Sequence, residues 1–512
     1  MMNGWEKSDP LIVAMKSANK AGKPAAELME PSGGAKGTTD QQSMHRTQCR
    51  DRESMSQALD RVRQAANQRK EERFTALFHH LNVELLRMSY FWLKRDAAPG
   101  VDGVTWVEYG EDLDVRLEDL HARIHRGAYR AQPSRRKYIP KPDGRQRPLG
   151  IAALEDKIVQ RAVVEVLNGI YEEDFLGFSY GFRPGRGQHD ALDALVVGLT
   201  YSKVNWVLDA DIAGFFDTVD HEWLIRFLEH RVGDQRMIRL IRKWLKVGVM
   251  EDGEVTRSER GTPQGAVVSP LLANIYLHYV FDLWANQWRG RHARGEVIIM
   301  RYADDIIVGF QYETDAKPFL ADLTRRMGEF MLSLHPEKTR LVEFGRFTAE
   351  NRKKRGQGKP ETFTFLGFTH ICGQSQGGRF QVWRKSRRDR MGAKLRAIKE
   401  ELERRRHHPI RSQGEWLRRV VAGFFNYHAV PTNFRSLSAF RYHVMDLWRR
   451  SLRRRSQKDR TTWDRIARLA DFWLPKPKIL HPWPSARFAV KHPRWEPGAR
   501  IAHAGICAGG AR

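Results

Sequence analysis

Two segments of the sequence place aspartates directly after apolar runs, where their carboxylates could hold a metal ion. One apolar run ends at Asp211, and Asp304 and Asp305 lie between two apolar arms, residues 297–302 and 306–308. Adjacent carboxylates between such arms are costly to bury as charges unless they bind cations. Mg²⁺ prefers a few carboxylates together with substrate phosphates. The pattern therefore predicts a magnesium site, although two adjacent aspartates also occur in ordinary solvated turns.

The elements that must position these aspartates are predicted to form an α/β layer between about residues 200 and 370. Short apolar runs indicate strands, and amphipathic helices alternate with them. The predicted strands are residues 206–208, 297–300, 306–310 and 363–368. A strand would end at Asp211 beside a hairpin tip that carries the other two aspartates, so the three carboxylates would converge. Asp209 and Asp217 are interpreted as structural or orienting residues.

Turn and cap signals predict the elements beside this layer. Residues 135–150 favour a β-hairpin, because residues 141–144 form a Lys-Pro-Asp-Gly turn signal between two extended segments. Residues 261–265 are predicted to form a rigid loop that leads into a helix capped by Ser269. Another helix is predicted to begin after Asp220, which is a good N-cap.

After about residue 375 the sequence predicts almost only helices, with dense arginine. The predicted helices are residues 385–407, 415–427 and 434–454. Aromatic residues spaced three and four apart, such as Phe424 and Trp448, are interpreted as core residues. The outward surface is strongly positive and ends in an arginine-rich run, residues 449–458. Such clusters bind phosphates strongly and in a salt-sensitive way, with little sequence information.

The composition supports a large protein with a polyanionic partner. The chain has 512 residues, of which 41% are hydrophobic, enough for several domains with real cores. It carries 88 Lys and Arg against 61 Asp and Glu, a formal net charge of +27. An excess of this size favours nucleic acid as the partner, with a merely soluble basic protein as the alternative.

The cysteines and the hydropathy exclude several other classes. Cys49, Cys372 and Cys507 lie far apart, so neither a disulfide framework nor a cysteine zinc site is predicted. This pattern fits a reducing, cytoplasmic location. No apolar run approaches the roughly 18 residues needed to span a bilayer, so no membrane partner is expected.

The order of the motifs identifies a family. The ordered motifs are Ala98-Pro99-Gly100-Val101-Asp102-Gly103, Ile139-Pro140-Lys141-Pro142-Asp143-Gly144, Arg147-Pro148-Leu149, Ser179-Tyr180-Gly181-Phe182-Arg183-Pro184, the segment that ends at Asp211, Pro263-Gln264-Gly265, Tyr302-Ala303-Asp304-Asp305, His335-Pro336-Glu337-Lys338-Thr339, Phe365-Leu366-Gly367-Phe368 and Gly423-Phe424-Phe425-Asn426-Tyr427-His428. On these motifs, the sequence from about residue 55 to 475 resembles the bacterial group II intron-encoded reverse transcriptases and maturases. The first motif looks like the extra N-terminal motif of intron and related enzymes.

The resemblance implies an α+β fold of the right-hand polymerase type, followed by a basic helical maturase region. The expected regions are 1–70, a loosely ordered basic N-terminal extension; 71–200, fingers with the extra motif; 201–370, a palm with a small antiparallel sheet; 371–475, a helical thumb and maturase (X) domain; and 476–512, a short basic C-terminal tail. The tail holds only Cys507 and no cysteine pair. The zinc-bearing endonuclease of many family members is therefore not expected.

The resemblance also implies roles for individual residues. Asp211, Asp304, Asp305 and the backbone of Ile212 would hold two Mg²⁺ ions, which drive the addition of deoxynucleotides to a DNA or RNA primer on an RNA template. The residues implied to contact the incoming nucleotide or its surroundings are Lys141 and Arg147 at the triphosphate, Phe216 at the sugar, Gln264 at the templating pair and Lys338 at the triphosphate or primer end.

The remaining roles concern RNA. Arg183 and Arg186 resemble template contacts, and the implied intron RNA-binding residues are Arg449, Arg450, Arg453, Arg454 and Arg455. The implied function is an RNA-directed DNA polymerase that binds its parent group II intron RNA, assists splicing and copies the intron into a DNA target during retrohoming. The alternatives are a splicing-only maturase with an inactive polymerase, and a host-recruited reverse transcriptase for defence or repair.

Overall fold

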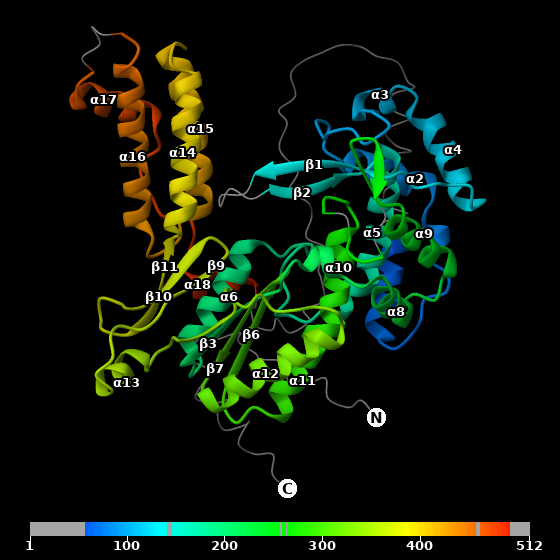
Figure 1. Cartoon of the computed structure of the whole chain (residues 1–512), viewed down its shortest axis with the longest axis horizontal. Coiled ribbons are helices and arrows are strands. Elements are labelled where there is room, and N and C mark those ends of the chain that lie inside the picture. Colours follow the sequence, from blue (N-terminus) through cyan, green and yellow to red (C-terminus); the bar gives the residue numbers. More distant parts are fainter. Residues whose placement is uncertain (1–56, 141–145, 257–258, 263, 457–460, 492–512) are drawn as a thin grey trace.

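Three groups of elements make up the chain (Figure 1). The computed structural model describes residues 57–140, 146–256, 259–262, 264–456 and 461–491. A first region of helices and a small sheet lies beside a central sheet with helices on it, and a helical bundle projects from the other side of that sheet. The fold is thus mixed α+β, as predicted.

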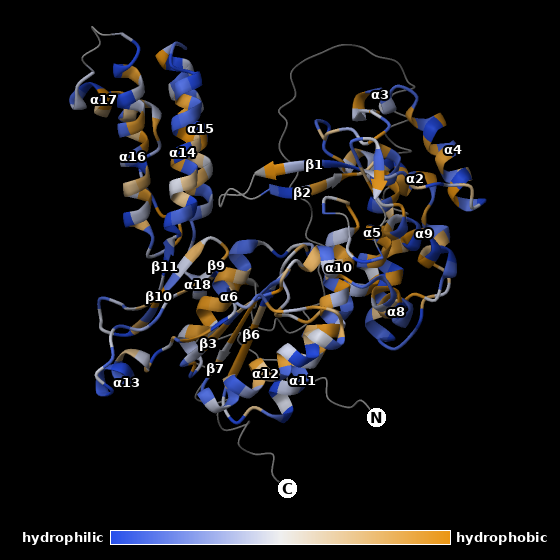
Figure 2. Ribbon diagram, viewed as in Figure 1, coloured by the Kyte–Doolittle hydropathy of each residue, from blue (hydrophilic) through white to orange (hydrophobic). Residues whose placement is uncertain are grey.

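The central sheet is four-stranded and antiparallel, with strand order β6-β7-β3-β8. Its strands are β3 (Trp206–Asp211), β6 (Val297–Tyr302), β7 (Asp305–Phe310) and β8 (Arg340–Glu343). The surrounding helical segments are α6 (Gln188–Tyr201), α7 (Phe215–Thr218), α8 (His221–Arg231), α10 (Ser269–Leu277), η2 (His278–Asp282), α11 (Leu283–Arg291) and α12 (Glu313–Glu329). Helices bury the apolar strands β6 and β7, which are the most hydrophobic ribbons of this region in Figure 2.

The first region combines a second four-stranded sheet with helices. The sheet has the order β2-β1-β4-β5 and consists of β1 (Ser134–Pro140), β2 (Gln146–Ile151), β4 (Val249–Glu251) and β5 (Glu254–Thr256). The helices are η1 (Phe78–His80), α2 (Val83–Trp92), α3 (Trp106–Gly110), α4 (Leu113–His125), α5 (Leu154–Asp174) and α9 (Gln235–Lys246). The predicted β-hairpin is confirmed, since β1 and β2 pair antiparallel, while its turn lies outside the described residues.

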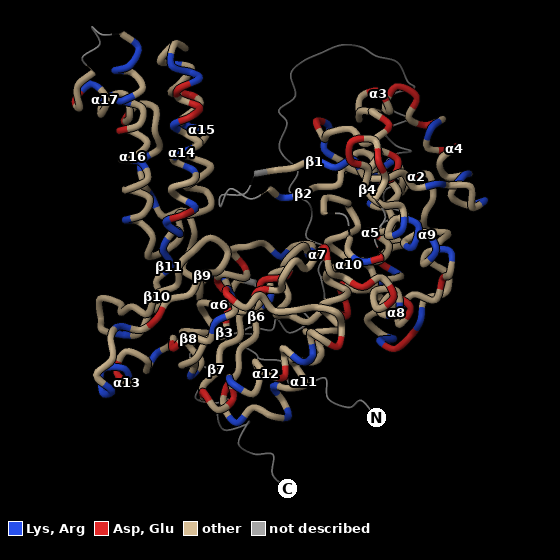
Figure 3. The backbone as a smooth tube through the Cα atoms, viewed as in Figure 1, with Lys and Arg blue, Asp and Glu red and all other residues tan. Residues whose placement is uncertain are grey.

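The bundle has a hydrophobic core of its own, separate from the core that the other two regions share. It consists of α14 (Arg388–Arg404), α15 (Ile410–His428), α16 (Phe434–Arg453) and α17 (Trp463–Trp473). Phe424 stacks on Phe440 and Trp448 is fully buried, so the prediction that these aromatics form core is confirmed. Lys and Arg recur along these helices (Figure 3).

A three-stranded sheet joins the bundle to the central region. Its order is β11-β10-β9, with β9 (Phe363–Phe365), β10 (Phe368–Gln374) and β11 (Phe380–Ser386). The single strand predicted for 363–368 is therefore wrong, because Leu366 and Gly367 both have positive φ and form a turn. Strand β11 also interrupts the part of the chain that was predicted to be almost wholly helical. A short helix, α13 (Thr348–Lys354), precedes this sheet.

The expected region boundaries stay predictions, and the packing near three of them is as follows. Residues 57–68 are helical, and Val62 and Ala66 are buried. Helix α6 contacts β6 and β11. Helix α18 (Pro484–Lys491), in the expected tail, packs on α6. None of the helices in the described ranges is long and apolar enough to cross a bilayer.

Candidate active site

The three predicted catalytic aspartates meet at one end of the central sheet, which we call the catalytic edge. Asp211 ends β3 and pairs in register with Asp305, the first residue of β7. Asp304 lies beside it in the β6–β7 turn, where Ala303 adopts a left-handed conformation with φ of 56°. The neighbouring Ile212 is buried and bridges to Leu334. Antiparallel pairing of β3 with β7 thus brings together side chains about ninety positions apart.

The carboxylates at the catalytic edge repel one another. Asp305 itself is exposed at the start of β7, but desolvation by the surrounding turn, together with the charges of Asp304 and Asp211, raises the pKa of its carboxyl to about 7. Burial and Asp211 also raise the pKa of Asp304, while Arg147 and Lys338 act to lower it. Because ionisation is disfavoured in the protein alone, a bound cation would stabilise the ionised carboxylates.

The donor set fits Mg²⁺ in kind, because it offers only carboxylate and backbone oxygens. Among the described residues, however, no group of three or more His, Cys, Asp or Glu side chains is arranged closely enough to hold an ion as it stands. Lys338 Nζ lies 2.6 Å from Asp211 Oδ2, so an ammonium group already neutralises this carboxylate. Metal binding would require Lys338 to release Asp211, with substrate oxygens completing the ligand set.

A buried ion pair beneath the catalytic edge holds its turn, and the sequence analysis missed it. Arg301 on β6 is fully buried and binds Asp282 in a bidentate pair, with N–O distances of 2.7 and 2.6 Å. Its guanidinium also donates to the Ala303 carbonyl at 3.1 Å and to Asn274 Oδ1 at 2.9 Å. The signal in the sequence for a buried charge is Arg301 itself, because the rest of its strand is mostly apolar.

The charge of this pair is well compensated. Burial alone would raise the pKa of Asp282, but the charge and hydrogen bonds of Arg301, with a contribution from His278, lower it overall. Arg301 also donates to Ser179 Oγ at 2.7 Å, and Asn274 donates to the Gly181 carbonyl at 2.7 Å. The catalytic turn is therefore fixed from below by a network that includes the loop before α6.

Phe216 and Gln264 lie on two segments that are hydrogen-bonded to each other. The Thr262 amide donates to the Phe216 carbonyl at 2.7 Å, and the Gly150 amide donates to the Gln264 carbonyl at 2.6 Å. Both predicted side chains are half-buried. A Cβ on Gly261 would press on the backbone of residues 216 and 217, which explains why the loop needs glycine there. The loop thus links α7 to the β1–β2 hairpin.

Of the two basic residues predicted at the triphosphate, the structure describes only Arg147. Lys141 lies outside the described residues. Arg147 is exposed on β2 opposite Ile139, and its positive charge reaches Asp304. The hairpin therefore carries at least one cation whose charge acts on the catalytic edge.

Arg183, which was predicted to contact the template, faces the protein interior. Its guanidinium is buried in an ion pair with Glu172 at 2.9 Å and donates to the carbonyls of Leu176 and Ser179. Arg186 is half-buried and donates to the Gly177 carbonyl at 2.6 Å. Burial lowers the pKa of Arg186 to about 10. These hydrogen bonds fix the loop, and the template contacts of both residues stay predictions.

The arginine run at the end of α16 divides into two groups. Arg449 and Arg450 both pair with Asp446, and Arg449 also lies 4.3 Å from the Trp463 ring centroid. The second group lines a surface hollow that we call the arginine hollow, formed by Arg406, Arg453, Arg454, Arg455 and Ser456. Arg453 and Arg454 are exposed, whereas Arg455 donates to the His408 carbonyl.

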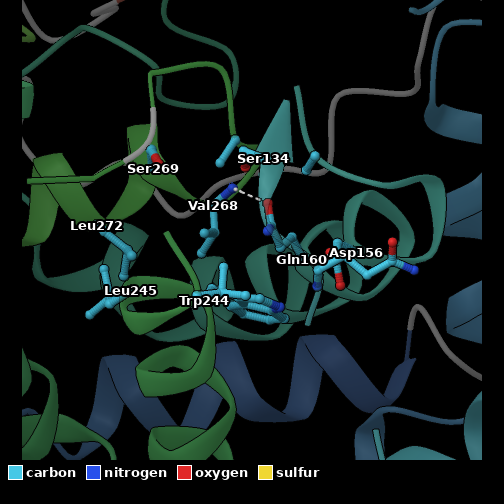
Figure 4. A pocket seen from close by; sticks show the side chains of 12 residues that line it. Ser134, Asp156, Gln160, Trp244, Leu245, Val268, Ser269 and Leu272 are labelled. Atoms are coloured by element: carbon cyan, nitrogen blue, oxygen red, sulfur yellow. Dashed lines mark hydrogen bonds between the residues drawn. The ribbon is translucent and has the colours of Figure 1, made fainter. Parts of the chain in front are cut away.

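A small cavity in the first region is structural (Figure 4). Gln160 accepts from the Val267 amide at 2.9 Å, and so supports the segment that follows the Gln264 loop. Asp156 accepts from Tyr129 and from the Gln132 amide, and burial raises its pKa to about 6. Its polar groups are satisfied within the protein, so this cavity is not a candidate catalytic site.

The catalytic edge, its supporting loop and the central sheet define a class of protein. Residues 139–370 match the model of the reverse transcriptase (RNA-dependent DNA polymerase) family. This range includes β2, the Gln264 loop, both carboxylate segments and β9. The chain therefore contains a reverse transcriptase domain.

Curated relatives narrow the class. The chain is 36% identical over 319 residues to protein YkfC of Escherichia coli (strain K12), covering 56% of this chain and 78% of that protein. It is 35% identical over 222 residues to the group II intron-encoded protein LtrA of Lactococcus lactis subsp. cremoris, covering 43% of this chain and 37% of LtrA. It is 31% identical over 284 residues to an uncharacterized 91 kDa protein in the cob intron of Schizosaccharomyces pombe, covering 46% and 35% of the two chains.

The chain belongs to the family of group II intron-encoded reverse transcriptases and maturases. The match spans most of YkfC but little more than a third of LtrA and of the cob intron protein.

Proposed function

We propose that the protein is an RNA-directed DNA polymerase that uses two Mg²⁺ ions and deoxynucleotide substrates. The observation that carries this proposal is the meeting of Asp211, Asp304 and Asp305 at one sheet edge, with Arg147 and Lys338 charges beside them. When bound there, Mg²⁺ would activate the primer hydroxyl and stabilise charge on the triphosphate. The first region would act as fingers, the central sheet as palm, and the bundle as thumb.

Within this proposal the chain's own residues position the reactants. The carboxylates of Asp211, Asp304 and Asp305 would hold the ions, and Arg147 would neutralise negative charge that accumulates on the incoming triphosphate. Lys338 would exchange its partner from Asp211 to a substrate phosphate. Phe216 would abut the sugar and exclude a 2′-hydroxyl, and Gln264 would lie against the templating pair.

A primer-extension assay tests this function. Purified protein with an RNA template, a DNA primer, deoxynucleotides and Mg²⁺ should extend the primer, and Asp304→Ala should reduce extension by at least a thousandfold. Glu350→Ala is a matched control, because it removes an exposed carboxylate on α13. Undiminished synthesis by Asp304→Ala would contradict the proposed metal site.

We further propose that the protein binds its parent group II intron RNA, assists its splicing and copies the intron into target DNA. The arginine hollow supports this proposal, since exposed arginines grip folded RNA through its phosphates. Splicing of the flanking intron should depend on the protein at low Mg²⁺. An unchanged splicing rate without protein would favour a host-recruited reverse transcriptase, whereas splicing without DNA synthesis would favour a splicing-only maturase.

A further inference from the structure

Phe182 is an exposed and strained aromatic residue next to the catalytic turn. Its φ of 58° lies in the left-handed region, which costs a residue other than glycine roughly 1–3 kcal/mol. Its side chain is 53% exposed, and it is not among the residues that pack against the hydrophobic core. The ring has no aromatic or cation–π partner among the described residues.

The neighbours of Phe182 force it into this position. A Cβ on Gly181 would overlap the backbone of Tyr302 and Ala303, so the loop is pressed against the turn that carries Asp304. On the other side, Arg183 enters the protein interior to pair with Glu172. The backbone between these two anchors is fixed, and the intervening phenyl ring is left outside.

This arrangement has an energetic cost, and within the described part of the chain Phe182 belongs to no hydrophobic cluster that would offset it. An apolar ring gains stability only when it leaves water, and a strained backbone persists only where the surrounding structure imposes it. Both arginines of the loop donate to backbone carbonyls of the protein, Arg183 to Ser179 and Arg186 to Gly177. What the loop presents to a ligand is the flat, apolar face of Phe182.

We infer that Phe182 stacks on a base of the template strand next to the catalytic turn. This inference rests on the proposed function, because it requires a primer and template at the catalytic edge. Base–aromatic stacking is tolerant of sequence, as copying demands, since every base offers a π-face.

The sheet order indicates which strand Phe182 meets. The Phe182 loop bridges to β6, at one edge of the central sheet, through Ser179 and Arg301. Lys338 and the β9–β10 turn follow at the opposite edge, beside β8, where Phe344 contacts Phe363. Lys338, which is predicted to lie at the triphosphate or primer end, is on the β8 side. We therefore assign the strand beside β6 as the complement of the primer.

Equilibrium binding of a labelled RNA template with a DNA primer tests the inference without catalysis. Phe182→Ala should weaken binding about tenfold, and Phe182→Tyr should bind like the wild type. The slope of affinity against salt should not change, because no phosphate contact is lost. Phe347→Ala is the matched control, since Phe347, the N-cap residue before α13, is 43% exposed but has an ordinary φ of −99°.

Phe182→Gly separates stacking from folding. Glycine adopts positive φ freely, so this variant should unfold at the same or a higher temperature than the wild type, yet bind as weakly as Phe182→Ala. Wild-type affinity in Phe182→Gly would overturn the inference. So would a loss of affinity in Phe182→Tyr equal to that in Phe182→Ala.

Abasic templates identify the base. A single abasic nucleotide is moved along the template, and at one position the wild type should lose about tenfold in affinity while Phe182→Ala loses nothing further. Equal losses in both proteins at every position would contradict stacking. If the wild type binds in this Phe182-dependent way but never extends the primer, the proposed function fails and the stacking inference stands.

Discussion

The catalytic edge and the arginine hollow are both rich in charge, but they arrange it in opposite ways. At the catalytic edge the arginine is inside and the carboxylates are outside, since Arg301 is buried against Asp282 while Asp305 reaches the surface. At the arginine hollow the exposed charges are Arg453 and Arg454. The first arrangement suits metal ions, and the second suits phosphates.

This difference shows that a basic composition does not reveal what each arginine does. Arg183, Arg231 and Arg384 are buried in ion pairs within or between elements, and they stabilise the fold. Arg453 and Arg454 belong to the surface charge that a polyanion would meet. The net charge predicts a nucleic-acid partner, but only the structure separates these two groups.

The largest expected effect comes from breaking the buried pair at the catalytic edge. Asp282→Ala or Arg301→Ala would each leave one buried charge without its partner, which costs roughly 3–5 kcal/mol of unfolding free energy. Urea denaturation measures this loss. The double variant Arg301→Met with Asp282→Leu should recover much of the stability, yet still synthesise DNA slowly, because Ala303 loses its donor. Full activity in the double variant would show that the pair does not position the turn.

Removing exposed arginines should weaken RNA binding without affecting the fold. Arg453→Ser with Arg454→Ser should lower affinity for the intron RNA about tenfold or more and reduce the salt slope by roughly 1.5, as two phosphate contacts are lost. Extension of a short primer should be unchanged. The matched control is Lys317→Ser with Arg325→Ser, which removes two exposed charges from α12. Equal losses in both double variants would mean that the arginine hollow is not a specific site.

Truncating the Phe216 side chain should change the selectivity between ribonucleotides and deoxynucleotides at the catalytic edge. Phe216→Ala opens space beside the sugar, so ribonucleotide incorporation should rise by roughly tenfold to a hundredfold relative to deoxynucleotides. Phe215→Ala is the comparison variant, because Phe215 is buried and its ring lies 5.4 Å from that of Phe216. Unchanged selectivity in a competition assay would exclude Phe216 from this role.

The smallest expected effect is a dependence of stability on pH. The folded pKa of Asp305 is about 7, against an ordinary value of 3.8, so between these values the folded state holds a proton that the unfolded state has released. Metal-free protein should therefore lose stability as the pH rises from 5 to 8, by on the order of 1–2 °C in unfolding temperature, since solvent screens this carboxylate.

Asp305→Asn should abolish that dependence. The pH dependence that Asp282 contributes has the opposite sign. Because its pKa is lowered in the folded protein, Asp282 stabilises the fold at pH values above its ordinary pKa, and this stability is lost as the pH falls through the lowered pKa. A stability curve that rises between pH 5 and 8, and is unchanged in Asp305→Asn, would contradict the repulsion described at the catalytic edge.

The sequence predicted the catalytic edge well because its signals are local. The apolar strands around Asp211 and Asp304 and the hairpin at 135–150 follow from periodicity and turn residues alone. The Arg301–Asp282 pair could not be predicted, since it depends on how η2 packs behind β6. The inward direction of Arg183 has the same cause, because a glutamate eleven positions away lies beside it only in the folded chain.

The central claim is that Asp211, Asp304 and Asp305 together bind the metal ions of nucleotide addition. Anomalous diffraction from crystals of the protein with primer, RNA template, deoxynucleotide and Mn²⁺ tests it directly. The account predicts two Mn²⁺ peaks within coordination distance of these carboxylates, with Lys338 displaced from Asp211. A nucleotide-bound complex without Mn²⁺ at these aspartates, or with Mn²⁺ only elsewhere, would contradict it.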